Sequence, residues 1–283
     1  MPMPSTVVAP IERDLVVVSG PDATSFLQSL VSQDLDPVAV GDAVHALLLE
    51  PRGKLVADLH ATRVADDEWW CVCEPGVGAV LAAGLMRFRI RVKVDIEDRS
   101  SSVAALSVRG PDAHTLTTDL AVTPVAVDWP DDPGVELIGS PDAIDTARGT
   151  IVERGAVGID GDAYETRRIE AGAPRQGYDI DESTIAQEAY LDRDAVSFTK
   201  GCFVGQELVC RIDTRGHVNR LLRRLRADTA ISRGATVEVD GKAVGMVTSA
   251  VGPVALAMLR REVEPASSVL VGSVTARVES LET

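Results

Sequence analysis

A strand, a turn and a helix recur along the first half of the chain. Residues 16–30 (VVVSGPDATSFLQSL) and 106–120 (LSVRGPDAHTLTTDL) share an apolar run, Gly-Pro-Asp-Ala and a closing leucine, and residues 137–147 (LIGSPDAIDTA) are a weaker third copy. The glycine allows the turn, and Asp22 or Asp112 can cap the helix that follows. The first copy also has the i, i+3, i+4, i+7, i+8 spacing of one buried helix face, at Ala23, Phe26, Leu27, Leu30 and Val31. Each copy therefore predicts a strand, a turn and a helix.

Alternation of period two marks residues 87–96 (RFRIRVKVDI). Its apolar positions, from Phe88 to Ile96, are separated by four cations: Arg87, Arg89, Arg91 and Lys93. This is the pattern of a half-buried strand with one cationic face, which is either simply solvated or an anion site for a small carboxylated ligand. Together with the strand–turn–helix copies, it predicts an α+β domain whose helices lie on mostly antiparallel sheet.

The last 60 or so residues have a different pattern, that of a small closed or nearly closed β domain. Asp240-Gly241 is a strong hairpin signal between two β-rich runs, and Gly252-Pro253 marks another break. Two more short strands are expected between residues 267 and 281. The arginine-rich segment 219–228 (NRLLRRLRAD) is then expected to join the two parts of the protein.

Composition narrows the class of protein. The formal charge of −15 opposes nucleic acid or an anionic membrane as the main partner. No apolar run approaches the ~20 residues of a spanning helix, and no basic and apolar leader opens the chain, so we expect a cytoplasmic location. Four cysteines without metal-site spacing are interpreted as reduced thiols, and no metal ligands are predicted.

Residues 199–211 (TKGCFVGQELVCR) concentrate unusual chemistry. They hold one of the four lysines and two of the four cysteines of the chain. The Lys200 ammonium and the start of a helix at Gln206 both favour a thiolate at Cys202, and Gly201 and Gly205 leave it unshielded. The alternative is that Cys202 has only a structural role, as a buried cysteine in a tight turn. The wider stretch 164–217 carries five of the seven Phe and Tyr residues, which suits either a core or a flat ligand: Tyr164, Tyr178, Tyr190, Phe198 and Phe203.

These segments resemble a known family. The run KGCFVGQE, residues 200–207, matches the signature Lys-Gly-Cys-aromatic-x-Gly-Gln-Glu of the folate-binding YgfZ branch of the glycine-cleavage T-protein (aminomethyltransferase) superfamily. The likeness extends along nearly the whole chain, through GPDATSFLQSLVSQDL, LEPRGKLVADLHATRV, LSVRGPDA and AVGMVTSAVGPVALAMLRR. It implies ferredoxin-like α/β-sandwich subdomains around a central folate channel, with a small C-terminal β-barrel. We expect residues 1–218 to form two interleaved subdomains, the second entered near residue 103, and residues 219–283 to form the barrel.

The resemblance also implies a ligand and a role. Tetrahydrofolate, or a one-carbon derivative, would bind in the channel, and Glu170 of the R-x-E-x-G stretch would grip the pterin. The protein would then support assembly or repair of iron–sulfur clusters in client enzymes, acting through Cys202. The remaining site residues follow from the ligand: Arg211 and the basic strand for the carboxylate tail, Tyr178 or Tyr190 for stacking, and Gln206 and Glu207 for holding the loop or facing the ligand.

One departure from the family pattern keeps an alternative open. T-proteins carry paired aspartates in G-G-x-x-D-D-L, whereas this chain reads RGKLVADL, so Ala57 replaces the first acid and Asp58 remains. Asp58 could serve as the acid/base of a folate-dependent aminomethyltransferase or demethylase. A third possibility, a tRNA-modification factor binding RNA through residues 87–93 and the arginines of 220–226, is opposed by the net charge.

Overall fold

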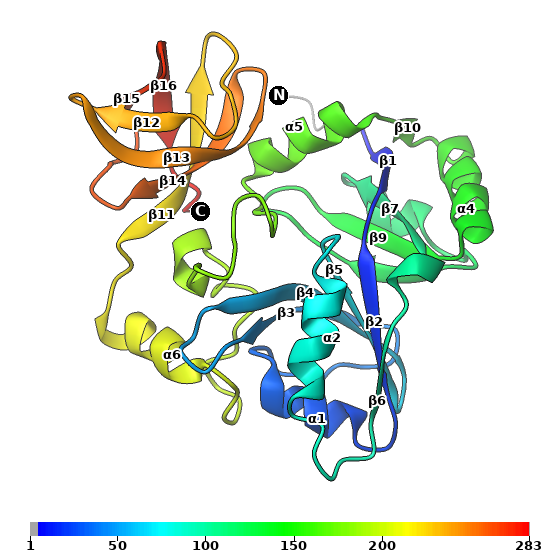
Figure 1. Ribbon diagram of the computed structural model, residues 1–283. Helices are drawn as coiled ribbons and strands as arrows, with labels where there is room; N and C mark the ends of the chain where they lie inside the picture. Colours follow the sequence, from blue (N-terminus) through cyan, green and yellow to red (C-terminus); the bar gives the residue numbers. More distant parts are fainter. Residues whose placement is uncertain (1–4, 283) are drawn as a thin grey trace.

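Two five-stranded sheets and a closed six-stranded barrel make up the fold (Figure 1). The computed structural model describes residues 5–282. One sheet has the order β10 (Val157–Gly158), β1 (Val7–Ile11), β7 (Ala104–Arg109), β9 (Gly134–Gly139), β8 (Thr123–Ala126). The other has the order β3 (Ala43–Leu49), β4 (Leu55–Ala65), β5 (Glu68–Cys73), β2 (Asp14–Ser19), β6 (Asp95–Asp98). All pairs in the sheets are antiparallel except β1 with β10.

The barrel closes the C-terminal part of the chain. Its strands follow the order β11 (Arg220–Ala227), β14 (Val254–Arg260), β13 (Lys242–Val251), β12 (Thr236–Val239), β15 (Ser268–Val271), β16 (Val274–Glu279). The predicted hairpin at Asp240-Gly241 joins β12 to β13, and both residues have positive φ, 51° and 73°. This left-handed pair is the geometry for which Asp-Gly is favoured in two-residue turns.

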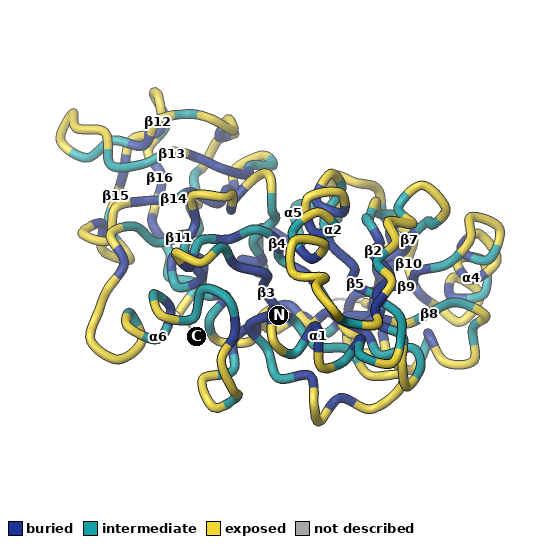
Figure 2. The backbone as a smooth tube through the Cα atoms, turned by 60° about the horizontal axis from the view of Figure 1, so that its bottom comes forward, coloured by how far each residue is buried: buried dark blue, intermediate teal, exposed yellow. Residues whose placement is uncertain are grey.

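The helices are α1 (Ala23–Leu30), α2 (Gly78–Met86), α3 (Ala113–Leu116), α4 (Pro141–Glu153), α5 (Gly161–Ala171) and α6 (Gln206–Arg215), with short 3-10 turns at Ser100–Ser102 and Ala186–Ala189. The first two pack on the sheet of β2 to β6 and the next two on the other sheet, whereas α5 packs mainly on barrel strands β13 and β14 and α6 on the second 3-10 turn. The inner faces of the two sheets pack on each other through a shared core that includes Leu15, Val17, Val72, Ala105, Val125 and Ile138. Figure 2 shows these strands as buried and the connecting loops as mostly exposed. No helix in residues 5–282 is long and apolar enough to span a membrane.

The three strand–turn–helix copies are confirmed as β2–α1, β7–α3 and β9–α4. Gly20 and Gly110 occupy equivalent turns with φ of 121° and 123°. A Cβ at Gly20 would lie 2.4 Å from the Lys93 carbonyl oxygen, and one at Gly110 would lie 2.9 Å from Thr6 Cα, so only glycine fits. The predicted face of α1 is buried from Ala23 to Leu30.

The predicted capping bonds are not made. Asp22 and Asp112 precede their helices, but neither side chain bonds to the helix. Asp22 Oδ2 instead accepts from Lys93 N at 2.8 Å, and the Asp112 carboxylate accepts from the Thr6 hydroxyl at 3.4 Å. Each aspartate therefore anchors a neighbouring segment rather than its own helix.

Residues 87–94 form a loop, so the predicted cationic strand is wrong. Of the predicted strand 87–96, only residues 95 and 96 pair with β2, as the start of β6. Arg91 has a φ of 57°, which bends the chain, and Lys93 N is bound by a side chain instead of a strand. Phe88 and Ile90 are 39% and 72% exposed. The alternation belongs to a surface loop of mixed basic and apolar residues.

The arginine-rich segment 219–228 is the first barrel strand, β11, rather than a joint. Its arginines are already paired with acids or polar groups. Arg220 donates to Glu188, Arg224 to Glu279 and Arg226 to Glu170, and the buried Arg223 donates to the Tyr190 hydroxyl. Guanidinium groups engaged in this way do not make a free cationic surface, which removes half of the predicted RNA-binding face.

Candidate functional site

The signature loop, residues 199–205, is packed onto the rest of the protein by its glycines and its lysine. Gly205 has a φ of 82°, and a Cβ there would lie 2.5 Å from the Glu50 carbonyl oxygen in the β3–β4 turn. Phe203 is buried, and its backbone N–H donates to Gln206 Oε1 at 3.2 Å. Gln206 thus closes the loop that precedes α6.

Lys200 has a different role from the one predicted. Its ammonium donates to three backbone carbonyls in the last turn of α1 and just after it, those of Gln28, Val31 and Gln33, at 2.7, 2.9 and 2.7 Å. Burial lowers its pKa to about 8. An ammonium has three donors, and all three are used here. Lys200 therefore fastens the loop to the end of α1, and among residues 5–282 no hydrogen bond joins it to Cys202.

Cys202 is exposed on this loop. Glu207, in the first turn of α6, and Arg211, on the same helix, are also exposed. Cys71 and Cys73 are buried instead, and burial raises the pKa of Cys71 to about 12. Cys202 is thus the accessible thiol of the signature, while the strand cysteines are packing residues.

A second polar region lies where the two sheets meet the barrel, and we call it the central junction. Arg13, between β1 and β2, donates to both oxygens of Glu136 at 2.8 and 2.7 Å and contacts Glu74 at 3.0 Å. Arg175 donates to the other Glu74 oxygen at 2.8 Å. Arg109, fully buried, lies 3.5 Å from Glu136. Charges of alternating sign therefore run from the sheet that contains β7 and β9 to the 175–178 loop.

Some buried polar atoms of this region have no protein partner. Among residues 5–282 these include Thr62 Oγ1, Arg109 Nη2 and Tyr164 Oη. Arg109 stacks on Trp129, with its guanidinium carbon 3.7 Å from the ring centroid, and burial raises the pKa of Tyr164. Because buried polar groups are normally hydrogen-bonded, these atoms stand out as unsatisfied. Arg109 Nη2 keeps an ionic contact with Glu136 at 3.5 Å, and of the three residues Tyr164 also lines a cavity, which is described next.

A cavity of about 380 Å³ opens beside the central junction. It is bounded by α5, the 175–178 loop and barrel strand β13. Its charged and aromatic lining consists of four arginines, four acids and two tyrosines: Glu12, Arg13, Glu74, Asp162, Tyr164, Glu165, Arg168, Arg175, Tyr178 and Arg233. Arg168 is saturated by Glu165, Asp179 and Ser249. Arg175 and Arg233 both lie against the Tyr178 ring, at 4.4 and 3.9 Å. We call this the arginine cavity.

Asp58 lies on the inner face of β4, held from two sides. Its Oδ1 is 2.5 Å from Nε2 of His45, and its backbone N–H donates to Gln176 at 2.8 Å. His60 stacks on His45 with ring centroids 4.6 Å apart and planes 6° apart. Burial raises the pKa of Asp58, but the charge of His45 outweighs it and the pKa is lowered, helped by Arg13. Asp58 is therefore an ionised acid next to the central junction.

Two residues that were predicted to contact the ligand, Glu170 and Tyr190, do not line the arginine cavity. Glu170 points to the other side of α5, where its carboxylate forms a bidentate pair with Arg226 at 2.6 and 2.9 Å. Tyr190 contacts Arg223 and Arg193 beside the barrel. Tyr178 does line the arginine cavity, but its ring is occupied by two guanidinium groups, so it orders Arg175 and Arg233 rather than offering a free stacking face.

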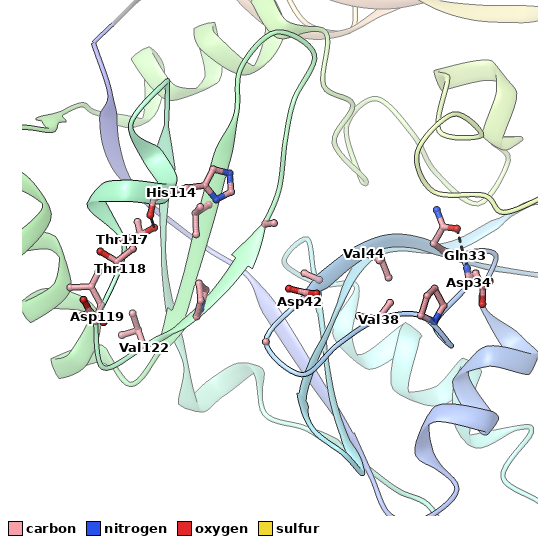
Figure 3. Close-up of a pocket in the computed structure, with 17 residues that line it drawn as sticks. Gln33, Asp34, Val38, Asp42, Val44, His114, Thr117, Thr118, Asp119 and Val122 are labelled. Atoms are coloured by element: carbon pink, nitrogen blue, oxygen red, sulfur yellow. Dashed lines mark hydrogen bonds between the residues drawn. The ribbon is translucent and has the colours of Figure 1, made fainter.

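A larger groove of about 880 Å³ separates the 33–44 loop from α3 and β8. Figure 3 shows side chains of the two sides facing each other across it, with Val38, Asp42 and Val44 opposite His114 and Val122. Its ionisable lining consists of Asp34, Asp42, Asp119 and His114. Such a lining does not suit a ligand with a carboxylate tail, which separates this groove from the arginine cavity.

Sequence reasoning missed most of the central junction. Arg13, Glu74 and Glu136 come from three distant segments, and nothing in their local pattern links them. Arg109 and the two histidines did carry a signal. Each interrupts the inward-facing side of an otherwise apolar strand, where an ionisable residue is expected only with a partner or a ligand.

Comparisons with known proteins agree with this architecture. The family model of the GCVT N-terminal domain matches residues 14–129, and that of the CAF17 C-terminal β-barrel domain matches residues 220–282. The chain belongs to the GcvT-like superfamily. Within that superfamily, a CAF17-type barrel fits the YgfZ/CAF17 branch that the signature indicates.

Individual members of the GcvT-like superfamily are distant relatives. An aminomethyltransferase of Lysinibacillus sphaericus is 27% identical over 262 residues, covering 83% of this chain and 71% of that protein. The mitochondrial iron–sulfur cluster assembly factor IBA57 homolog of Mycosarcoma maydis is 27% identical over 300 residues, covering 88% and 72%. The crystal structure of the glycine cleavage system aminomethyltransferase T from Bartonella henselae aligns with a TM-score of 0.83 at 21% identity, over 99% of this chain and 86% of that one. The predicted fold is thereby confirmed.

Proposed function

We propose that this protein binds tetrahydrofolate, or a one-carbon derivative, at the central junction and supports iron–sulfur cluster assembly or repair in client proteins. The observation that carries the proposal is a buried polar site with unpartnered atoms, next to an arginine-lined cavity, in a GcvT-like fold with a CAF17-type barrel. The name of the IBA57 homolog supports the client class.

The residues of the junction suit folate at both ends. Tyr164 would hold the polar edge of the pterin, because its buried hydroxyl has no hydrogen-bond partner and its side chain lines the arginine cavity. Arg175 and Arg233 would hold the carboxylate tail, since guanidinium groups bind carboxylates strongly. Bound tetrahydrofolate would supply a carrier for one-carbon units. These assignments replace Glu170, Arg211 and the 87–93 loop as folate contacts.

Calorimetric titration with tetrahydrofolate and its one-carbon derivatives tests the binding site. Arg175→Gln should weaken binding about tenfold or more, and more for polyglutamylated forms, because a charge-assisted contact is lost. Arg211→Gln is the matched control, since Arg211 is exposed on α6, and it should change affinity less than twofold. The opposite ranking would return the tail to α6 and refute the placement in the arginine cavity.

Cys202 is proposed as the acting thiol. It is exposed on a loop that Lys200 and Gly205 hold in place, so a client protein can reach it. In a strain lacking this gene, a Cys202→Ser protein should fail to restore iron–sulfur enzyme activity, while Cys210→Ser, the control thiol on α6, should restore it. Full rescue by Cys202→Ser would remove the thiol from the proposal.

A second candidate function is a folate-dependent aminomethyl transfer or demethylation with Asp58 as acid/base. It is favoured by the position of Asp58, an ionised and buried carboxylate beside the junction. Incubation with tetrahydrofolate and methylamine donors should then yield methylene-tetrahydrofolate, and Asp58→Asn should abolish the yield. Absence of turnover with every donor would leave the auxiliary role alone.

A further inference from the structure

His45 and Asp58 lie on the inner face of the sheet that contains β3 and β4. His45 and His60 are direct cross-strand partners on β3 and β4, and Asp58 is two residues before His60 on the same face. The two imidazole rings stack in parallel, and Nε2 of His45 meets Asp58 Oδ1. Gln176 bonds to β4 on either side of this point, accepting from Asp58 N and donating to the Val56 carbonyl. The carboxylate and the ring are therefore held in fixed geometry.

Each of the two groups uses one atom in their shared hydrogen bond and keeps one atom open. Among the described residues, neither Asp58 Oδ2 nor His45 Nδ1 has a hydrogen-bond partner, whereas Oδ1 and Nε2 are 2.5 Å apart. The side chains are 15% and 21% exposed. Asp58 thus has an oxygen free for a ligand, and His45 has a nitrogen free for water.

The surrounding charges bias this pair toward holding a proton. Burial lowers the pKa of His45, but the carboxylate of Asp58 outweighs burial and, with Asp194, raises it. Burial and then the charge of His45 lower the pKa of His60 well below its usual value, despite Asp58, and Arg13 and Arg109 act in the same direction. His60 is therefore a neutral ring that supports His45 without competing for its proton.

We propose that His45 is a proton-transfer residue that acts through Asp58, exchanging protons between a ligand at the central junction and solvent. The proposal rests on the proposed folate site. Asp58 Oδ2 takes a proton from the ligand, and His45, whose Nε2–H stays bonded to Oδ1, then releases its Nδ1 proton to water because the carboxylate charge that held it is gone; the reverse sequence delivers one. Each passage moves one proton and no electrons, and it breaks and forms only N–H and O–H bonds.

The test uses 5-formyltetrahydrofolate as the probe, with calorimetry in buffers of different ionisation enthalpy between pH 5.5 and 8.5. Binding to the wild-type protein should be accompanied by exchange of up to about one proton. His45→Gln keeps an N–H donor near Asp58 but cannot titrate, so it should lose this exchange while affinity at pH 8.5 stays within about threefold. His60→Gln should retain the exchange.

A second measurement does not depend on the variants. The His45 ring proton signals of the wild-type protein, followed by NMR against pH, should report a changed pKa when the probe is bound. An unchanged His45 titration, or a wild-type pH profile in His45→Gln, would overturn the proposal while leaving folate binding intact. Failure of the wild-type protein to bind the probe would instead refute the folate site, and this inference with it.

Discussion

The signature loop and the central junction use their polar groups in opposite ways. In the loop, the conspicuous residues satisfy the backbone: Lys200 holds three carbonyls and Gln206 closes a turn. In the junction, side chains from separate segments hold one another and leave buried atoms free. The difference teaches that a dense motif can be mainly a structural clasp that presents a single group, here Cys202, while ligand chemistry is assembled from residues scattered along the chain.

The largest expected loss of stability comes from a buried ion pair beside the arginine cavity. Arg168→Met would leave the fully buried Asp179 carboxylate without its guanidinium partner, 2.8 Å away. Breaking such a pair typically costs about 3–5 kcal/mol. Urea denaturation should show this loss in the free energy of unfolding. Arg226→Met removes the half-exposed pair that Arg226 of β11 makes with Glu170 of α5, and it should cost less than about 1 kcal/mol. Equal losses in the two variants would show that burial does not decide what an ion pair contributes here.

The second-largest loss of stability is expected at Lys200, which holds the signature loop to α1. Lys200→Met would leave three carbonyls near the end of α1 without their donor, and we expect a loss of about 2–4 kcal/mol in the free energy of unfolding. Lys242→Met, an exposed lysine at the start of β13, should stay within about 0.5 kcal/mol. A neutral Lys200→Met would mean that the signature lysine is there for chemistry after all.

The Asp58–His45 pair gives an intermediate effect that depends on pH. Folding raises the pKa of His45 above 6.5 and lowers that of Asp58 below 3.8. The pair therefore stabilises most between those values, losing its contribution as pH rises through the raised His45 pKa or falls through the lowered Asp58 pKa. Asp58→Asn should cost about 1–2 kcal/mol at pH 5.5 and less at pH 8.5. Denaturation curves at both pH values check the sign, and a larger cost at pH 8.5 would contradict the pairing.

The smallest effect is expected at Glu170. Because its carboxylate is paired with Arg226 on the far side of α5, Glu170→Gln should change folate affinity less than twofold and stability less than about 1 kcal/mol. Calorimetry and denaturation on the same preparation measure both. A tenfold loss of affinity would restore the pterin contact that the family motif implies and would move the ligand to the outer side of the helix.

Local patterns were sufficient for much of the fold. The first two strand–turn–helix copies and the barrel hairpin depend on glycines with positive φ, and α1 depends on its buried face; neighbouring residues determine both features. The 87–96 segment was predicted wrongly because its alternation is also what a loop shows when Arg91 turns the chain and Asp22 binds the backbone of Lys93. Periodicity records side-chain types, not the hydrogen bonds that make a strand.

The site was less predictable for a related reason. Asp58 and Tyr178, both selected from the sequence, lie beside the central junction, whereas Glu170, assigned from its motif, is paired with Arg226. Successive residues of a helix are rotated by about 100°, so Arg168 and Glu170, two positions apart, face nearly opposite sides; Arg168 lines the arginine cavity and Glu170 does not. The partners Arg13, Glu74 and Glu136 meet only through sheet packing, which no local window contains.

The double attachment of α5 has a mechanical consequence. On its inner side Arg168 donates to Ser249 of β13 at 2.7 Å, and on its outer side Glu170 pairs with Arg226 of β11. A helix bonded to the barrel along both edges cannot act as a hinge about which the barrel moves away. A ligand would therefore have to enter the arginine cavity without such a movement of the barrel. The half-exposed Tyr178 ring lies between Arg175 and Arg233 in the wall of this cavity. Attachment along both edges of α5 therefore fixes the position of this wall relative to the barrel.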